Sequence, residues 1–496
     1  MRRRQTFIIA LIFLILSSSP LLLPAENQKL TCYTVLVGKK ASADGSVMVA
    51  HNEDDYGDIT VNVRKIRPRN YGAPVRISLG HGGYYETDGR TSGFLWIEAT
   101  TQEFADSFVN EHGVLITSDA CASRETVEDY TDGGIGYMLR RIVAEKARSA
   151  REAVQLAGEL IEKYGYRASG RTYSIADKDE AWMLAVIRGR HWFARRVPDD
   201  EVAVIPNYYT IREINPDDPE NFLGSRDIIE YAEKRGWYDR QKDGPFDFKK
   251  VFSRPASREP IFDGNTLRMW RGLEKLSGKK WEIGGDYPFS FKPAKKVTVE
   301  MLMELLRDHY EGTAYDATDG YRSGSPNRTK FRTICTSSTI NSFVAVLNKR
   351  KPEPLAIMLW LAFGKPDTTI YLPLYYGVES LPPGAGYGPT DHDYEIFYRQ
   401  HFQPDYLLPV RDQLLNTMVL KLERKVEENY GEMIEIIRKE LHPLEREFLK
   451  SWKAFEQKFT AESRKSPEKA ANMLHGYVSG AFERTVKTYR RLLAEH

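Results

Sequence analysis

Short runs of apolar and β-branched residues, separated by polar segments, fill most of the first 210 residues and predict β-strands. The first is expected at 32–37 (CYTVLV) and the second at 47–50, joined through Asp44-Gly45, a strong hairpin signal. Further strands are expected at 94–100, 104–109, 114–117, 172–176, 182–187, 192–197 and 202–205. The hairpin would place the start of the first strand beside the polar end of the second.

The pattern changes at residues 135–163, where apolar residues recur at helical spacing and predict one or two amphipathic helices. Residues 210–295 are rich in Pro, Asp and Gly, which indicates long loops with short helices. A helix is then expected at 299–309, and strands at 333–347, 356–363 and 368–372. Strands in blocks followed by helices in blocks predict an α+β architecture of antiparallel sheets covered by helices.

Residues 406–496 are predicted to form a helical C-terminal extension. Apolar residues step by three or four from Leu415 to Leu441, which predicts one long helix ending near Pro443. Two more helices are expected at 444–460 and 467–494. Such helices could form a coiled coil that binds a partner, or could pack their apolar stripe on the rest of the chain. The breaks at the prolines favour packing.

The N-terminus has the features of an export signal. Three arginines at 2–4 precede an apolar run of ten residues at 7–16, which is shorter than the roughly 20 residues that span a bilayer. We therefore predict a signal peptide at 1–25, a short propeptide at 26–31, and a secreted or periplasmic protein. The alternative is an uncleaved membrane anchor extending through Leu23. After signal cleavage, no stable membrane insertion is expected.

The composition is that of a globular protein, with 41% hydrophobic and 28% charged residues among 496. Lys and Arg number 71 and Asp and Glu 69, so no sequence-independent binding to nucleic acid is expected. The three cysteines, Cys32, Cys121 and Cys335, leave at least one unpaired. An unpaired cysteine in an exported chain is either a reactive thiol or a small buried apolar residue. We expect Cys121 and Cys335 to be buried and inert.

Cys32 is the candidate nucleophile, because the hairpin places it beside the cluster His51-Asn52-Glu53-Asp54-Asp55. A carboxylate cluster can bind Ca²⁺ or Mg²⁺, but this one lacks EF-hand spacing. A thiol needs a nearby base, and no histidine spacing suggests a Cys–His pair. If the chain is cut before Cys32, the new α-amine, with a reference pKa of about 7.7–8.0, could be that base.

Several segments in the same order resemble the dipeptidase-A-type peptidases, which are cysteine N-terminal nucleophile (Ntn) hydrolases related to penicillin V acylase, bile salt hydrolase and the secernins. They are TCYTVLVGKKASADGSVMVAHNEDD, VNEHGVLITSDA, VIPNYYTIREI, NTLRMWRG and FGKPDTTIYLPLYYGV. The resemblance implies an Ntn-hydrolase αββα sandwich over residues 32–405. It also implies hydrolysis of small peptides, dipeptides above all, through a thioester, with no metal and no cofactor.

The resemblance implies roles for individual residues. Cys32 matches the nucleophile, and its freed α-amine the general base. Asp54 matches the acid that holds this amine, and Asn207 the asparagine that donates to the oxyanion. Arg268 matches the arginine near the nucleophile, with Arg271 as the alternative.

The sequence departs from the family pattern at two places. His51 stands where many relatives have arginine, which puts a thiolate-stabilising role of this position in doubt. Ser118-Asp119-Ala120 stands where the acylase relatives have an oxyanion-binding asparagine, so a second donor must come from elsewhere. Two other functions stay open, an amidase or acylase on N-acyl substrates and a non-catalytic binding protein with a decayed site. A homo-oligomer is possible.

Overall fold

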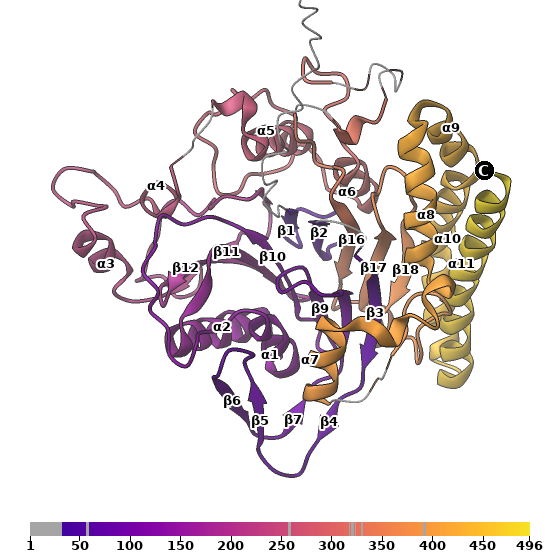
Figure 1. Cartoon of the computed structure of the whole chain (residues 1–496), viewed down its shortest axis with the longest axis horizontal. Coiled ribbons are helices and arrows are strands. Elements are labelled where there is room, and N and C mark those ends of the chain that lie inside the picture. The colour runs from indigo at the N-terminus through magenta and orange to yellow at the C-terminus, as the bar shows by residue number, and fades with distance from the viewer. Residues whose placement is uncertain are drawn as a thin grey trace, which may run out of the picture. The chain divides into compact units, whose positions relative to one another are not determined.

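Two antiparallel β-sheets form the centre of the molecule (Figure 1). The structure, a computed structural model, describes residues 32–496 except 56–58, 256–258, 317, 319–321, 323, 329–330, 389 and 391–392. The first sheet has the order β14 (Val202–Ile205), β1 (Tyr33–Val37), β2 (Val47–Asp54), β16 (Thr339–Leu347), β17 (Ile357–Phe363) and β18 (Leu372–Tyr375). The second has the order β15 (Phe222–Gly224), β13 (Trp192–Val197), β12 (Ala181–Gly189), β11 (Tyr166–Ala176), β10 (Leu115–Ala120), β9 (Ser107–Asn110), β8 (Phe94–Ala99) and β3 (Val61–Ile66).

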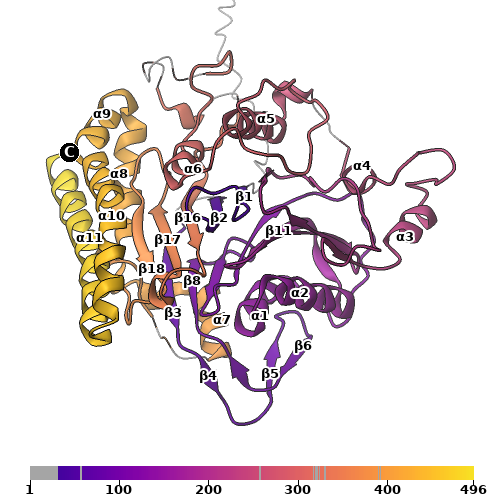
Figure 2. The same cartoon turned by 180° about the vertical axis from the view of Figure 1, so that it is seen from behind.

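The two sheets pack face to face, and helices cover both outer faces (Figures 1 and 2). Helices α1 (Met138–Lys146) and α2 (Ala150–Tyr164) lie on the second sheet. Helices α5 (Gly264–Ser277) and α6 (Val299–Leu306) lie on the first, together with the C-terminal helices α8 (Leu415–Glu428), α10 (His442–Ser463) and α11 (Pro467–Glu495). This is the predicted αββα arrangement. Both faces of β1 are buried, because a helix covers one and the second sheet the other.

Most of the predicted strands and helices are present with small shifts of their ends. The second strand is longer than predicted, since β2 continues through the polar cluster to Asp54. The strand expected from residue 333 begins only at Thr339, because the carbonyl of Ile334 accepts from the side chain of Asn52, 3.0 Å away, instead of joining the ladder. The strand expected at 368–372 lies at Leu372–Tyr375.

The helix predicted from Leu415 to Leu441 was wrong as a single element. It is two helices, α8 and α9 (Tyr430–Glu440), because Asn429 between them leaves the helical region with φ −143°. Pro443 lies in the first turn of α10, where proline fits because its missing N–H has no partner to lose. Apart from short 3₁₀ turns, the remaining strands and helices of the described residues are β4 (Arg69–Asn70), β5 (Val75–Ser78), β6 (Tyr84–Thr87), β7 (Arg90–Thr91), α3 (Ile228–Lys234), α4 (Phe248–Phe252) and α7 (Tyr394–Phe402).

The predicted signal peptide (1–25) and propeptide (26–31) lie outside the described residues. Among the residues that the structure does describe, no helix combines the length and the apolar character needed to cross a membrane.

Candidate active site

Cys32 lies directly before β1, the second strand from one edge of the first sheet, and the residue is 2% exposed. The hairpin register pairs Tyr33 with Asn52 and Thr34 with His51, which sets Cys32 beside Glu53. The Cys32 Sγ donates to Glu53 Oε1 at 2.9 Å. The predicted meeting of the thiol with the polar end of the second strand is therefore confirmed.

A chain of hydrogen bonds continues from this pair across to the second sheet. His51 Nε2 lies 3.1 Å from Glu53 Oε2, and His51 Nδ1 lies 2.7 Å from Thr34 Oγ1. The Thr34 hydroxyl donates to Asp119 Oδ2 on β10 at 2.7 Å. A hydroxyl has one proton to give, so when Asp119 is ionised Thr34 accepts from His51 Nδ1–H. The neutral imidazole then accepts at Nε2, and this requires a protonated Glu53.

Burial governs the protonation of these groups. It lowers the pKa of His51 to about 4 and raises the pKa of Asp119 to about 7. It also raises the pKa of Glu53, against the opposing charges of Arg140 and Arg171. His51 is thus uncharged at neutral pH and gives the thiol no positive partner.

The thiol itself is held in its neutral form. Burial raises the pKa of Cys32 well above its ordinary value, and the nearby carboxyl groups of Glu53, Asp119 and Asp54 raise it further. Cys32 therefore needs a base of its own before it can act as a nucleophile.

Asp54 ends β2 on the opposite face of the strand from Glu53, and it is fully buried. Thr339 Oγ1 donates to its Oδ1 at 2.6 Å, and Arg332 Nη2 donates to its Oδ2 at 2.9 Å. Arg268 Nη1 lies 3.9 Å from the same Oδ2. Burial raises the pKa of Asp54, and the two arginines oppose this rise. Arg332 and Thr339 were not predicted, because only the fold brings them to Asp54.

Arg268, on α5, connects Cys32 with Asn207. Its Nη1 donates to the main-chain carbonyl of Cys32 at 2.9 Å, and its Nη2 donates to Asn207 Oδ1 at 2.8 Å and to Asn265 Oδ1 at 2.7 Å. These donors fix the oxygen of the Asn207 amide toward Arg268. The Asn207 Nδ2 is buried and, within the described residues, has no hydrogen-bond partner. It is a donor available to a developing negative charge.

The alternative arginine lies elsewhere. Arg271 Nε donates to Asp308 Oδ1 at 2.8 Å, and its Nη2 donates to the carbonyl of Glu311 at 2.8 Å. Of the two arginines, Arg268 is the one that the structure brings to Cys32. Cys121 and Cys335 are fully buried, as expected, and burial raises the pKa of Cys121 to about 12.

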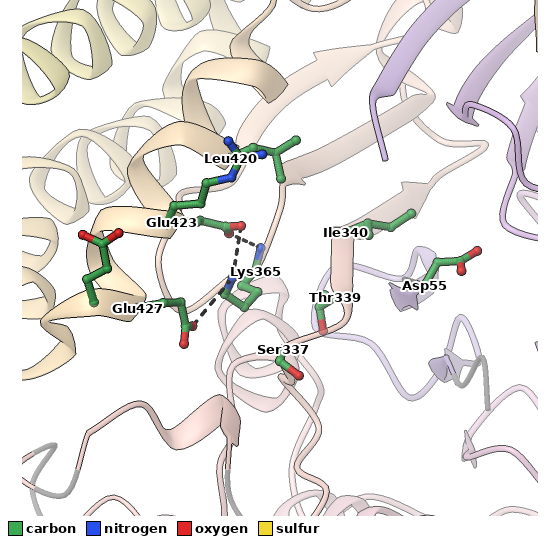
Figure 3. A pocket seen from close by; sticks show the side chains of 10 residues that line it. Asp55, Ser337, Thr339, Ile340, Lys365, Leu420, Glu423 and Glu427 are labelled. Atoms are coloured by element: carbon green, nitrogen blue, oxygen red, sulfur yellow. Dashed lines mark hydrogen bonds and ion pairs between the residues drawn. The ribbon is translucent and has the colours of Figure 1, made fainter. Parts of the chain in front are cut away.

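A pocket of about 450 Å³ lies between the end of β2, the start of β16 and helix α8 (Figure 3). Thr339, which donates to Asp54, lines it together with Asp55. Its other wall carries charged side chains of α8, and Lys365 Nζ there lies 3.1 Å from Glu423 Oε2. The pocket therefore offers a polar, charged lining rather than an apolar one.

The active-site group could also bind a metal ion. The ligand atoms of Cys32, His51 and Glu53 lie within 4.8 Å of one another. A soft divalent ion bound here would displace the proton of the Cys32 thiol.

The model of peptidase family C69 matches residues 31–403. The relatives include a probable dipeptidase of Latilactobacillus sakei, 27% identical over 69% of this chain and 74% of its own length. A probable dipeptidase A of Streptococcus pyogenes serotype M1 is 29% identical over 72% of this chain and 77% of its own length. A dipeptidase A of Lactobacillus helveticus is 27% identical over 74% of this chain and 80% of its own length.

Among solved structures, a penicillin V acylase from Agrobacterium tumefaciens matches with a TM-score of 0.35 and 12% identity over 69% of this chain and 85% of that one. A mutant conjugated bile acid hydrolase from Clostridium perfringens matches with a TM-score of 0.32 and 10% identity, over 70% of this chain and 92% of the hydrolase chain. The family match covers most of the chain. The chain belongs to peptidase family C69 and is a hydrolase that acts on peptide bonds.

Proposed function

We propose that this peptidase is an exported cysteine-type dipeptidase. Its nucleophile is the Cys32 thiol, and its general base is the α-amine of Cys32, freed when residues 1–31 are removed. The relatives named above as dipeptidases support the substrate class. The basic and apolar N-terminal segment supports export.

The contacts of Arg268 are the observation that carries this proposal. The guanidinium holds the carbonyl of Cys32 and the amide oxygen of Asn207 at once. It thereby holds the carbonyl of Cys32 in place and fixes the Asn207 amide through its oxygen, which leaves the Asn207 Nδ2 free to donate to a substrate oxygen. A nucleophile and an oxyanion donor held by one rigid side chain suit acyl transfer.

Removal of the preceding residues changes the chemistry at Cys32. Before removal, the nitrogen of Cys32 belongs to an amide and cannot take a proton, so the thiol stays neutral. Afterwards a neutral α-amine takes the Sγ proton, and the thiolate attacks the carbonyl carbon of the scissile peptide bond. The carbonyl oxygen becomes an oxyanion, which the Asn207 Nδ2 stabilises.

Collapse of this intermediate breaks the C–N bond. The α-ammonium gives its proton to the leaving amine, which departs as the first amino acid, and a thioester to Cys32 remains. Water then attacks the thioester carbon while the α-amine takes a proton from it. The C–S bond breaks, the sulfur regains a proton, and the second amino acid is released. Asp54 is proposed to hold the ammonium form that exists between these transfers.

Mass spectrometry of the purified active protein tests the proposal directly. The mature chain should begin at Cys32, and Cys32→Ala should retain residues ahead of position 32 and lose dipeptide hydrolysis. The matched control is Cys121→Ala, which removes a buried thiol just after β10 in the second sheet and should keep activity. Circular dichroism checks that both variants are folded.

Substrate comparison completes the test. Dipeptides should be hydrolysed much faster than penicillin V or conjugated bile acids, and the reverse order would favour an acylase. Dipeptide hydrolysis by Cys32→Ala at the parent rate would reject the mechanism. So would an active protein that still carries peptide ahead of Cys32.

A further inference from the structure

A second group of metal-ligand side chains lies outside the active site. His309 follows α6, Cys335 precedes β16, and Asp367 lies between β17 and β18. All three are buried, and their ligand atoms lie within 4.8 Å of one another. Segments far apart in the sequence thus meet around one imidazole, one thiol and one carboxylate.

Each oxygen of the Asp367 carboxylate lies at the distance of a tetrahedral zinc-type site from one of the other two ligand atoms. Metal bonds of about 2.0–2.3 Å at tetrahedral angles put the ligand atoms roughly 3.3–3.6 Å apart. His309 Nε2 lies 3.5 Å from Asp367 Oδ2, and Cys335 Sγ lies 3.3 Å from Asp367 Oδ1. Asn327 Oδ1 lies 3.1 Å from His309 Nε2 and 3.8 Å from Cys335 Sγ, which offers an oxygen for the fourth position.

The surrounding side chains are placed as outer partners of a metal site. Glu311 Oε1 lies 3.1 Å from His309 Nδ1, so it can hold the ring with Nε2 turned inward, as carboxylates do behind metal-bound histidines. The Tyr430 hydroxyl, at the start of α9, donates to Asp367 Oδ2 at 2.6 Å. Asn327 Nδ2 donates to the same oxygen at 3.1 Å.

We propose that His309, Cys335 and Asp367 bind one divalent ion of the zinc type, with a structural role. Nitrogen, sulfur and oxygen ligands together favour a borderline-soft ion over Ca²⁺ or Mg²⁺. On binding, the S–H bond of Cys335 breaks, a metal–sulfur bond forms, and the proton passes to the solvent. A pocket of about 400 Å³ is lined by Tyr430 and Glu427. The Tyr430 hydroxyl contacts Asp367, and Glu427 Oε1 lies 3.3 Å from Asn327 Nδ2.

Such an ion would hold the segment that supports Asp54. Thr336, next to Cys335, donates its main-chain N–H to Thr339 Oγ1 at 3.2 Å, and Thr339 donates to Asp54. The ion would fix this segment to Asp367 and, through Tyr430, to α9. It would not take part in peptide hydrolysis.

Cobalt binding to the full-length Cys32→Ala protein tests the proposal, since this background removes the thiol of the active-site group. After treatment with a chelator, the protein should bind one equivalent of Co²⁺ with a thiolate-to-cobalt charge-transfer band. One equivalent of Zn²⁺ should abolish the band. Adding Cys335→Ala should remove the band, and adding Cys121→Ala, the matched control, should leave it unchanged.

X-ray absorption on the zinc-loaded Cys32→Ala protein gives a measurement that does not depend on the folding of further variants. It should show one sulfur at about 2.3 Å and nitrogen or oxygen ligands at about 2.0 Å. Less than about 0.1 equivalent of bound metal would overturn the proposal, and so would a coordination shell without sulfur. Either result would identify the group as a metal-free cluster of hydrogen bonds.

Discussion

At the scale of single residues, the Asn207 side-chain amide is the proposed hydrogen-bond donor to the oxyanion. Arg268 fixes its oxygen, and its nitrogen is buried without a partner in the described part of the chain. A buried donor left unpaired is costly in the resting protein. In the proposed mechanism that cost is recovered when an oxyanion forms beside the Asn207 Nδ2, so the interaction would favour the transition state over the bound substrate.

Asn207→Ala should therefore lower kcat for dipeptides by about 10²–10³-fold, equivalent to about 3–4 kcal/mol, with little change in KM. Steady-state kinetics on the processed enzyme measure this. Asn265→Ala is the matched control, because Asn265 also accepts from Arg268 but is not proposed to touch substrate; its loss should be at least tenfold smaller. Equal losses in the two variants would contradict a donor role for Asn207.

Asp119 should make stability fall as pH rises. Burial raises its pKa to about 7, whereas the unfolded chain gives up this proton near pH 4. Between these values the folded state holds more protons, so the free energy of unfolding decreases with increasing pH, by at most about 4 kcal/mol from this group. Asp119→Asn removes the titration and should gain stability relative to the parent between pH 4 and pH 7.

Urea unfolding of both proteins at pH 4.5 and pH 7.5 measures this difference. His51, whose pKa burial lowers to about 4, acts in the opposite direction over part of the range, so the variant is compared with the parent at each pH. A difference that does not change with pH would show that Asp119 is ionised throughout.

At the scale of elements, α5 lies unusually close to β1. Gly272 faces Tyr33, and a Cβ at this position would overlap the Tyr33 hydroxyl and come within 3.0 Å of Val204 Cγ1. The glycine lies one turn after Arg268, so this close approach brings the guanidinium within reach of Cys32.

Gly272→Ala should push α5 away from the sheet. We expect a loss of about 1–3 kcal/mol in the free energy of unfolding and a lower kcat, because Arg268 moves with the helix. Gly476→Ala in α11 is the control, since its Cβ meets nothing within 4 Å, and it should stabilise the protein by about 1 kcal/mol through helix propensity. Thermal and urea unfolding measure the stability of both variants. Equal effects of Gly272→Ala and Gly476→Ala would show that the protein does not need the close packing of α5 on β1.

The sequence predicted elements well where apolar periodicity was strong, and the hairpin from Cys32 to the polar cluster followed from Asp44-Gly45 alone. It missed β3 to β7 between residues 61 and 91, where strands are short and carry many polar residues. It also missed the break at Asn429, because the apolar stripe continues across it. Periodicity reports which face is buried and not whether the helix axis is continuous.

The site residues also differ in how far a local sequence signal could predict their contacts. Cys32 and Glu53 are joined by one hairpin, so their meeting could be predicted from a local signal. Arg332 reaches Asp54 from 278 positions away, and no local pattern encodes that contact. Arg268 and Asn207 were placed at the site by resemblance to a family.

At the scale of the whole molecule, a partly buried ion pair connects the C-terminal helices with the sheet region. Arg307, which follows α6, donates to both oxygens of Glu445 on α10, at 2.8 and 2.6 Å. Glu445 also accepts from the main-chain N–H of Tyr371 at 2.7 Å. Removing the carboxylate would leave a partly buried guanidinium and the buried N–H of Tyr371 without this acceptor.

Glu445→Ala should therefore lower the free energy of unfolding by about 3–5 kcal/mol. Glu447→Ala, two residues along the same helix, removes an exposed pair with Arg484 and should change it by no more than about 1 kcal/mol. Urea unfolding compares them. Similar values for the two variants would mean that the C-terminal helices are attached chiefly by apolar packing.

The three cysteines are buried and unpaired, and each sulfur has oxygen atoms as its hydrogen-bond partners. No disulfide bond therefore has to form or rearrange while the chain folds. A thiol–disulfide exchange enzyme has nothing to act on, and added reductant should leave the melting temperature unchanged. The same native state is therefore accessible in an oxidising and in a reducing compartment, so the protein can be produced in either.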